Sequence, residues 1–204
     1  MKKYENGIDF IVVVFYRFEY ARLLVESIKQ YVKGIDYTIY IANNGINEGP
    51  GNGYDILKDM FKDNPNVVII KGVDQTADSN NIHHSNYTCK IDGRGVAIGS
   101  YTQVLAMDKA VRAGNRKYLC YQDADTIFLN EWVDDIIPLL DDYFFVSHMW
   151  RDDLGIQKDQ FMTIKRENIE NNYLYEKDDL YPNIHYKDTC GTLALYCQKR
   201  IYHS

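Results

Sequence analysis

Tyr118-Leu119-Cys120-Tyr121-Gln122-Asp123-Ala124-Asp125 is the stretch that decides the fold predicted for this chain. It is an apolar run, typical of a buried strand, that stops at two carboxylates separated by one small residue. Because alternate side chains of a strand point to the same side, Asp123 and Asp125 converge on one point if the extended conformation lasts to Asp125. Converging carboxylates repel each other unless a proton or a cation lies between them, and Mg²⁺, Mn²⁺ and Ca²⁺ take such oxygen ligands. The stretch therefore predicts a divalent-metal site, with a solvated strand-to-loop junction as the alternative, since Asp is also frequent in turns.

The segments on both sides of this stretch predict an α/β fold. Unbroken β-branched and aromatic runs favour buried strands, and apolar residues at helical spacing favour helices. Strands are expected at 8–15, 37–42, 67–70 and 117–122, and helices at 18–32, 54–62 and 98–113. This alternation predicts right-handed crossovers and a mostly parallel sheet with helices on both faces. Ligands of such sheets bind beyond the carboxyl ends of the strands, where Asp123 and Asp125 fall.

The remaining segments carry weaker patterns. Residues 72–95 are polar without usable periodicity, and so long a connection inside a domain is usually functional or mobile. Beyond Asp125, the sequence favours a short helix near 132–140, strands at 143–146 and 160–164, a loop at 171–184 and a final helix at 189–200.

Composition narrows the class of protein. A chain of 204 residues can bury a full core in one large domain. The net charge of -6 argues against a nucleic-acid or anionic-membrane partner. The four cysteines form no Cys-x-x-Cys pair, and Cys120 is expected to be a small core residue. The first apolar run is too short for a membrane span and too soon broken for a signal peptide, which makes a cytoplasmic location the expectation.

Four motifs, taken in chain order, resemble the GT-A glycosyltransferases and in particular their family 2-like branch. Val14-Phe15-Tyr16-Arg17 resembles the end of that family's first strand, and Ala42-Asn43-Asn44-Gly45 the end of its second. Gly93-Arg94-Gly95-Val96-Ala97 resembles the stretch before the helix that leads to the metal strand, and Asp123-Ala124-Asp125-Thr126 is similar to the Asp-x-Asp motif. The resemblance covers roughly residues 8–130, and its specificity lies in the order of all four motifs.

The resemblance implies transfer of a sugar from a UDP- or dTDP-type donor to a hydroxyl of a glycan acceptor, with inversion. Asp123 and Asp125 would hold Mn²⁺ or Mg²⁺ against the diphosphate, with Asp123 also near the donor. The other expected donor-binding residues are Phe15 and Tyr16 at the nucleobase, Arg17 and Arg94 at the phosphates, Gly95 at close backbone approach, and Asn43 with Asn44 at the base edge.

Several of these assignments have alternatives. Phe15 and Tyr16 could instead cap the core, and Arg17 could form a surface ion pair with Glu19 or Asp36. Asn43 stands where the family commonly has an Asp that binds uracil, which leaves the identity of the base open.

The acceptor half of the site is less defined. Asp188, at the start of the last expected helix, is the first candidate for the general base, with an N-cap role as its alternative. The reserve candidates are Asp152 and Asp153 for the base, His148, His185 and His203 for a third metal ligand, and Trp150 and Tyr181 for stacking on the acceptor sugar.

We expect one GT-A domain over 1–204, with a nucleotide-sugar half at 1–130 and an acceptor-side half at 131–204, which could itself belong to a longer protein. A non-catalytic nucleotide-sugar- or glycan-binding domain of the same fold is the main alternative. A sugar-1-phosphate nucleotidylyltransferase is disfavoured, because that class has a Gly-rich loop with Arg after its first strand, where this chain has Phe15-Tyr16-Arg17-Phe18-Glu19.

Overall fold

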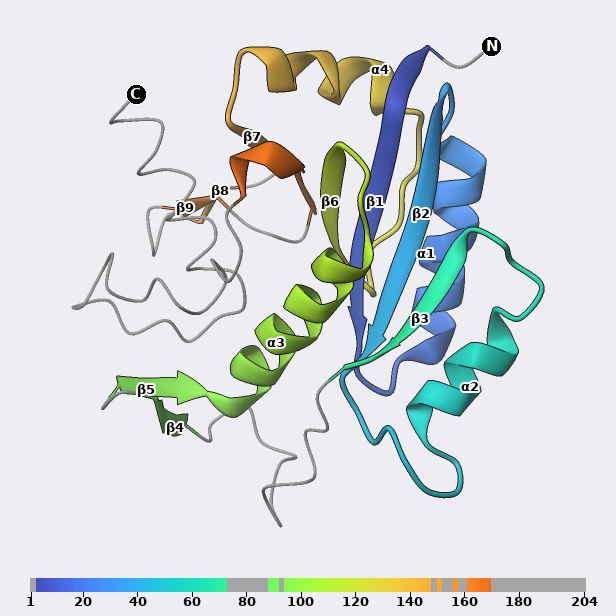
Figure 1. The fold of residues 1–204 in the computed structure, drawn as a ribbon, viewed down its shortest axis with the longest axis vertical. Helices are drawn as coiled ribbons and strands as arrows, with labels where there is room; N and C mark the ends of the chain where they lie inside the picture. The colour runs from blue at the N-terminus through green and yellow to red at the C-terminus, as the bar shows by residue number, and fades with distance from the viewer. Residues whose placement is uncertain are drawn as a thin grey trace.

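A six-stranded sheet in the order β3-β2-β1-β6-β10-β7 forms the centre of the molecule (Figure 1). The computed structural model describes residues 3–72, 88–91, 94–147, 150–151, 156–157 and 161–169. The sheet strands are β1 (Tyr4–Val14), β2 (Ile35–Asn43), β3 (Val67–Lys71), β6 (Tyr118–Asp123), β7 (Phe145–Ser147) and β10 (Phe161–Lys165). The β1–β2, β2–β3 and β1–β6 pairs are parallel, whereas β10 is antiparallel to both of its neighbours. The predicted mostly parallel α/β sheet is confirmed.

Helices cover both faces of the sheet, as predicted. Alternate β1 side chains, including Phe10 and Val12, pack on the face that carries α1 (Phe18–Tyr31), α2 (Gly53–Met60) and α4 (Val133–Ile136). Ile11 points to the other face, which α3 (Ile98–Ala113) covers (Figure 1). Both faces are apolar because a parallel sheet enclosed by helices exposes neither face to water.

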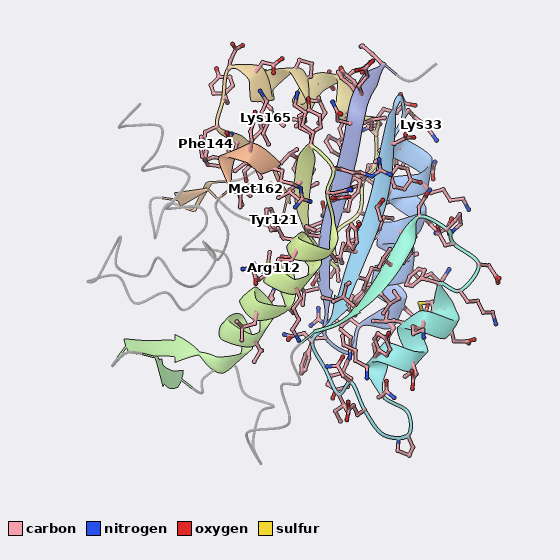
Figure 2. The ribbon with its side chains drawn as sticks, in the orientation of Figure 1. Lys33, Arg112, Tyr121, Phe144, Met162 and Lys165 are labelled. Carbon is pink, nitrogen blue, oxygen red and sulfur yellow. The ribbon has the colours of Figure 1, made fainter. Side chains whose placement is uncertain are left out.

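The core under α3 contains side chains from the parallel strands and from the antiparallel strand β10. Tyr121 of β6 and Met162 of β10 are register partners, are fully buried, and lie close together in Figure 2. Ala106 and Ala110 of α3 belong to the same core, and their small side chains let the helix approach the strands. Cys120 points to the opposite core as the predicted small core residue, and burial raises the pKa of its thiol to about 12.

Two antiparallel hairpins accompany the sheet: β4 (Thr88–Ile91) with β5 (Arg94–Ala97), and β8 (Trp150–Arg151) with β9 (Ile156–Gln157). The first hairpin overlaps the end of the segment 72–95, which lacks periodicity. The Asp92-Gly93 dipeptide between its strands is a strong hairpin signal that could have predicted it. The expected loop at 171–184 and helix at 189–200 fall outside the described residues.

A buried ion cluster around Asp9 stabilises the amino edge of the sheet. The carboxylate of Asp9 on β1 is fully buried and accepts bonds from Arg166 Nη2 at 2.7 Å and from the Arg116 backbone N–H at 2.9 Å. Arg166 also donates to the carbonyl oxygens of Val111 and Arg116. A Cβ on Gly114 would stand 2.2 Å from the Asp9 carboxylate, so this position requires glycine. Charge-assisted bonds thus compensate the buried Asp9 and tie β1, the end of α3 and the end of β10 together.

Candidate functional site

The carboxyl edge of the sheet brings three of the four sequence motifs together. Val14, the last residue of β1, is the register partner of Asn43 on β2, and Val13 is the partner of Asp123 on β6. The loops that follow these strands therefore start side by side. The ends of β1, β2 and β6 thus lie along one edge, as parallel pairing requires.

The two aspartates are joined by a turn rather than by extended backbone. β6 ends at Asp123, and the carbonyl of Asp123 accepts the backbone N–H of Thr126 at 3.2 Å and its hydroxyl at 2.7 Å. Gln122 also donates to the Thr126 hydroxyl. The condition for convergence by strand alternation, extended backbone through Asp125, is not met, because Thr126 closes the chain onto Asp123. Strand alternation therefore does not determine where the two carboxylates point.

Asp125 forms an ion pair with Arg17. The distance from Arg17 Nη1 to Asp125 Oδ2 is 3.0 Å, and the two side chains are 64% and 47% exposed. Arg17 is the N-cap residue of α1, and its guanidinium carbon lies 5.8 Å from the ring centroid of Tyr20. Glu19, a partner considered from the sequence, accepts from Arg22 instead. The positively charged guanidinium of Arg17 thus contacts Asp125, one of the two predicted metal ligands.

Phe15 and Tyr16 are exposed aromatic rings at the same edge. They are 37% and 42% exposed, and their ring centroids are 4.6 Å apart. Tyr16 has a φ of 55°, a left-handed conformation that is rare for an aromatic residue. A Cβ on Gly45 would lie 3.2 Å from Tyr16 Cζ, so the ring rests against the loop after β2. The strained backbone thus supports a ring that is partly open to solvent.

Asn43 and Asn44 are buried and hold the loop that follows β2. The Asn43 amide donates to the Ile46 carbonyl and to Asn47 Oδ1, each at 2.9 Å, and its oxygen accepts the Gly45 N–H at 3.4 Å. The Asn44 amide donates to Thr102 Oγ1 of α3 at 3.4 Å. In this structure the Asn43 amide is engaged within the loop. Its role at the nucleobase stays a prediction, as does that of Asn44.

The end of β3 adds two residues that the sequence analysis missed. Lys71 Nζ lies 3.6 Å from Glu48 Oε1 and 5.3 Å from the ring centroid of Tyr54. A Cβ on Gly72 would lie 2.2 Å from the Asn43 carbonyl oxygen, so the chain can pass β2 here only as glycine. The available signal was that Lys71 ends a parallel strand, since such strands all end at one edge.

The other predicted site residues divide into two groups. Arg94 and Gly95 begin β5, just before α3. Asp188, the candidate base, lies outside the described residues, and so do Asp152, Asp153, His148, His185, His203 and Tyr181. Trp150 belongs to β8.

The donor chemistry of the aspartate pair fits a hard divalent cation. Mg²⁺ is usually held by one or two carboxylates together with waters and substrate phosphates. Asp123 is partly buried at the strand end and Asp125 is exposed beside it, which matches that ligand number. Within the described part of the chain, no group of three or more His, Cys, Asp or Glu side chains gathers as a complete metal cage. Two neighbouring carboxylates are a donor set that suits a cation which completes its shell with waters and phosphates.

No helix in the described ranges is long and apolar enough to cross a bilayer.

Comparisons with known proteins identify the fold. No family model matches the sequence, and no curated protein matches it. Among solved structures, the mannosyltransferase PcManGT from Pyrobaculum calidifontis, in complex with GDP-Man and Mn²⁺, is similar with 13% identity and a TM-score of 0.52. The match covers 81% of this chain but only 46% of that chain, so this chain spans about half the length of that protein. The galactosyltransferase LgtC, in complex with donor and acceptor sugar analogs, is similar with 14% identity and a TM-score of 0.55, over 91% of this chain and 70% of that one. Together with the strand order and the motif positions, these similarities show that the chain has the GT-A fold of nucleotide-sugar glycosyltransferases.

Proposed function

We propose that this protein is a metal-dependent glycosyltransferase that moves a sugar from a nucleoside-diphosphate donor to a hydroxyl of a glycan acceptor. The observation that carries the proposal is that the Asp123–Asp125 turn starts beside the Phe15–Arg17 loop at the carboxyl edge of a GT-A sheet. PcManGT, of the same fold, binds GDP-Man and Mn²⁺, which supports both a nucleotide-sugar donor and a metal.

The chemical problem at this edge is a leaving diphosphate in a protein of net charge -6. Asp123 and Asp125 would hold Mn²⁺ or Mg²⁺. When bound, that cation supplies electrostatic stabilisation of the charge that develops on the diphosphate. Arg17 lies beside Asp125 and adds positive charge at the same point, and we assign Arg94 and the backbone at Gly95 to the same task. A planar guanidinium matches two phosphate oxygens at once.

Tyr16 and Phe15 would stack on the nucleobase, since exposed aromatic rings accept any base face. The buried Asn43 and Asn44 keep the loop after β2 in place beneath the Tyr16 ring. Asp188 would accept the proton of the acceptor hydroxyl on the face opposite the leaving group, which is the arrangement that inversion needs. The UDP- or dTDP-type donor and the inverting course are proposed from the family resemblance.

The test is a calorimetric titration of the protein with UDP, dTDP and GDP, each with and without Mn²⁺. We expect one nucleotide to bind only with the metal, and Asp125→Asn to weaken that binding by about tenfold or more, since charged contacts are worth about 1.5–3 kcal/mol. Asp63→Asn, an exposed aspartate beyond the end of α2, is the matched control and should leave binding unchanged.

Two results would contradict the proposal. If nucleotides bind equally weakly with and without metal, in the parent and in Asp125→Asn alike, the aspartate pair is only a strand-to-loop junction. Tight metal-dependent binding without donor hydrolysis or transfer would instead indicate a non-catalytic nucleotide-sugar-binding domain.

A further inference from the structure

We propose that Arg17 couples metal binding to diphosphate binding, because it occupies Asp125 in the free protein and leaves it for the diphosphate. This inference rests on the proposed function, and it assigns to Arg17 a positioning role beyond contact with phosphate. It predicts that the metal binds weakly without nucleotide. Nucleotide binding then makes the metal ligand Asp125 available.

The first argument is competition at one oxygen. Asp125 Oδ2 lies 3.0 Å from Arg17 Nη1. A divalent cation and a guanidinium on the same carboxylate repel each other, so each weakens the binding of the other. A metal that arrives without a ligand must therefore displace Arg17.

The second argument is that only a side chain has to move. The Arg17 carbonyl already accepts the N–H groups of Tyr20 and Ala21 at the first turn of α1, which fixes its backbone. The Arg17 side chain is 64% exposed, and ion pairs between exposed side chains are weak. The guanidinium can therefore leave Asp125 without disturbing the helix.

The third argument is that a diphosphate offers Arg17 a better partner. Guanidinium binds phosphate oxygens in a bidentate fork, whereas one nitrogen of Arg17 contacts one oxygen of Asp125. Lys71, at the carboxyl end of β3 two strands from β1, already lies near Glu48 and over Tyr54. The transfer of Arg17 to phosphate frees Asp125 at the moment when the metal gains phosphate ligands.

Equilibrium linkage makes this coupling measurable. If UDP raises the affinity for Mn²⁺ by a given factor, Mn²⁺ must raise the affinity for UDP by the same factor. Part of that factor comes from direct contact of metal and phosphate. The part that comes from Arg17 disappears when its guanidinium is removed.

The experiment measures free Mn²⁺ by electron paramagnetic resonance during titration of the protein with Mn²⁺ alone, and again with saturating UDP, or with GDP or dTDP if that nucleotide binds. We expect Arg17→Gln to bind Mn²⁺ alone about three- to tenfold more tightly than the parent, and to show a coupling factor smaller by at least as much. Arg17→Lys keeps a positive charge beside Asp125 and should restore most of the competition. Arg22→Gln, which removes an arginine of the same helix that pairs with Glu19, is the control and should behave as the parent.

The outcomes separate the inference from the function on which it rests. If the parent binds Mn²⁺ and nucleotide cooperatively while Arg17→Gln shows an unchanged or weaker affinity for Mn²⁺ alone, the inference is overturned and the function stands. If neither parent nor variant binds Mn²⁺ or any nucleotide, although both melt cooperatively, both are overturned.

Discussion

At the scale of single residues, the strained backbone of Tyr16 helps to distinguish the two roles considered for its ring, stacking on a nucleobase and capping the core. A left-handed aromatic residue costs about 1–3 kcal/mol, and that strain is repaid only if the surroundings or a ligand use the ring. Tyr16 is 42% exposed, so it contributes less to the core than its size suggests.

We predict that Tyr16→Asn leaves the free energy of unfolding unchanged or raises it by up to about 1 kcal/mol, because Asn adopts a positive φ readily. The same change should weaken nucleotide binding by about tenfold through the loss of base stacking. Urea unfolding and calorimetry measure the two effects. A clear loss of stability with unchanged nucleotide affinity would make Tyr16 a cap of the core.

We predict that Asn43→Asp, which introduces the residue common in the family, destabilises the protein by about 2–4 kcal/mol. The substitution removes the amide that donates to Ile46 and Asn47 and buries a carboxylate facing two acceptors. The measurement is urea unfolding near neutral pH. An Asp variant as stable as the parent, with tighter UDP binding, would instead place this side chain at the base edge.

Contacts between distant residues are what the sequence could not supply at this scale. Arg17 was expected near phosphate or in a local ion pair, but its partner Asp125 lies 108 residues further along the chain. Only the β1–β6 register brings the two loops together. Likewise, Gly53 packs directly against the Asn43 side chain, an approach that no local pattern encodes.

At the scale of elements, α2 is tied to the site through its first turn. Asn52 is its N-cap, accepting the Asp55 N–H at 2.8 Å and donating to the Gly49 carbonyl at 2.7 Å. A Cβ on the next residue, Gly53, would lie 2.5 Å from Asn43 Oδ1. The start of α2 and the loop after β2 therefore pack as one unit.

We predict that Asn52→Ala lowers the free energy of unfolding by about 1–2 kcal/mol, the usual loss when an N-cap side chain is removed. Nucleotide affinity should fall as well, because the Asn43 loop loses its support. Asp59→Ala, at an exposed position in the same helix, should change neither quantity. Full stability in Asn52→Ala, measured by urea unfolding, would contradict this role of the cap.

Periodic elements were predictable, and elements that depend on backbone pairing were not. The helix at 98–113 was predicted with the bounds that the structure gives. β1 begins four residues earlier than expected, because polar residues from Tyr4 onward join β2 through backbone pairing across an irregularity before Ile8. The antiparallel direction of β10 also follows from its partners and not from its own five residues.

At the scale of the whole molecule, the buried thiol of Cys120 makes stability depend on alkaline pH. Burial raises the pKa of Cys120 to about 12 from an ordinary value of 9.0. Below the ordinary value, folded and unfolded chains both keep the thiol proton. Above it, the unfolded chain loses the proton while the folded chain keeps it, so stability falls as the pH rises toward the folded pKa.

We therefore predict that a change from about pH 8 to about pH 10 lowers the free energy of unfolding of the parent by about 1.4 kcal/mol more than that of Cys120→Ala. The comparison between the two proteins cancels the titration of lysines and tyrosines, which they share. Denaturant unfolding at both pH values measures it. Equal losses in both proteins would mean that the folded protein ionises this thiol as readily as the unfolded chain.

At the scale of the whole molecule, the sequence predicted which strand ends meet at the carboxyl edge of the sheet. Motifs at strand ends reach a common edge because a parallel sheet orders its carboxyl ends, and this rule needs only the strand pattern. The candidate base Asp188 follows a segment, 171–184, that is expected to be a loop, and no comparable rule places a side chain after such a loop relative to Asp123.

The antiparallel direction of β10 has a consequence for engineering this protein. Its first residue, Phe161, pairs with Gln122 beside the aspartate turn, whereas its last residue, Lys165, pairs with Tyr118 and leads directly to Arg166 in the ion cluster around Asp9. One five-residue strand thus begins at the carboxyl edge of the sheet, beside the aspartate turn, and is anchored at the opposite edge through Arg166. Segments grafted before Phe161 would enter beside the candidate site while Arg166 preserves the register, which makes this junction suitable for exchanging segments without disturbing the sheet.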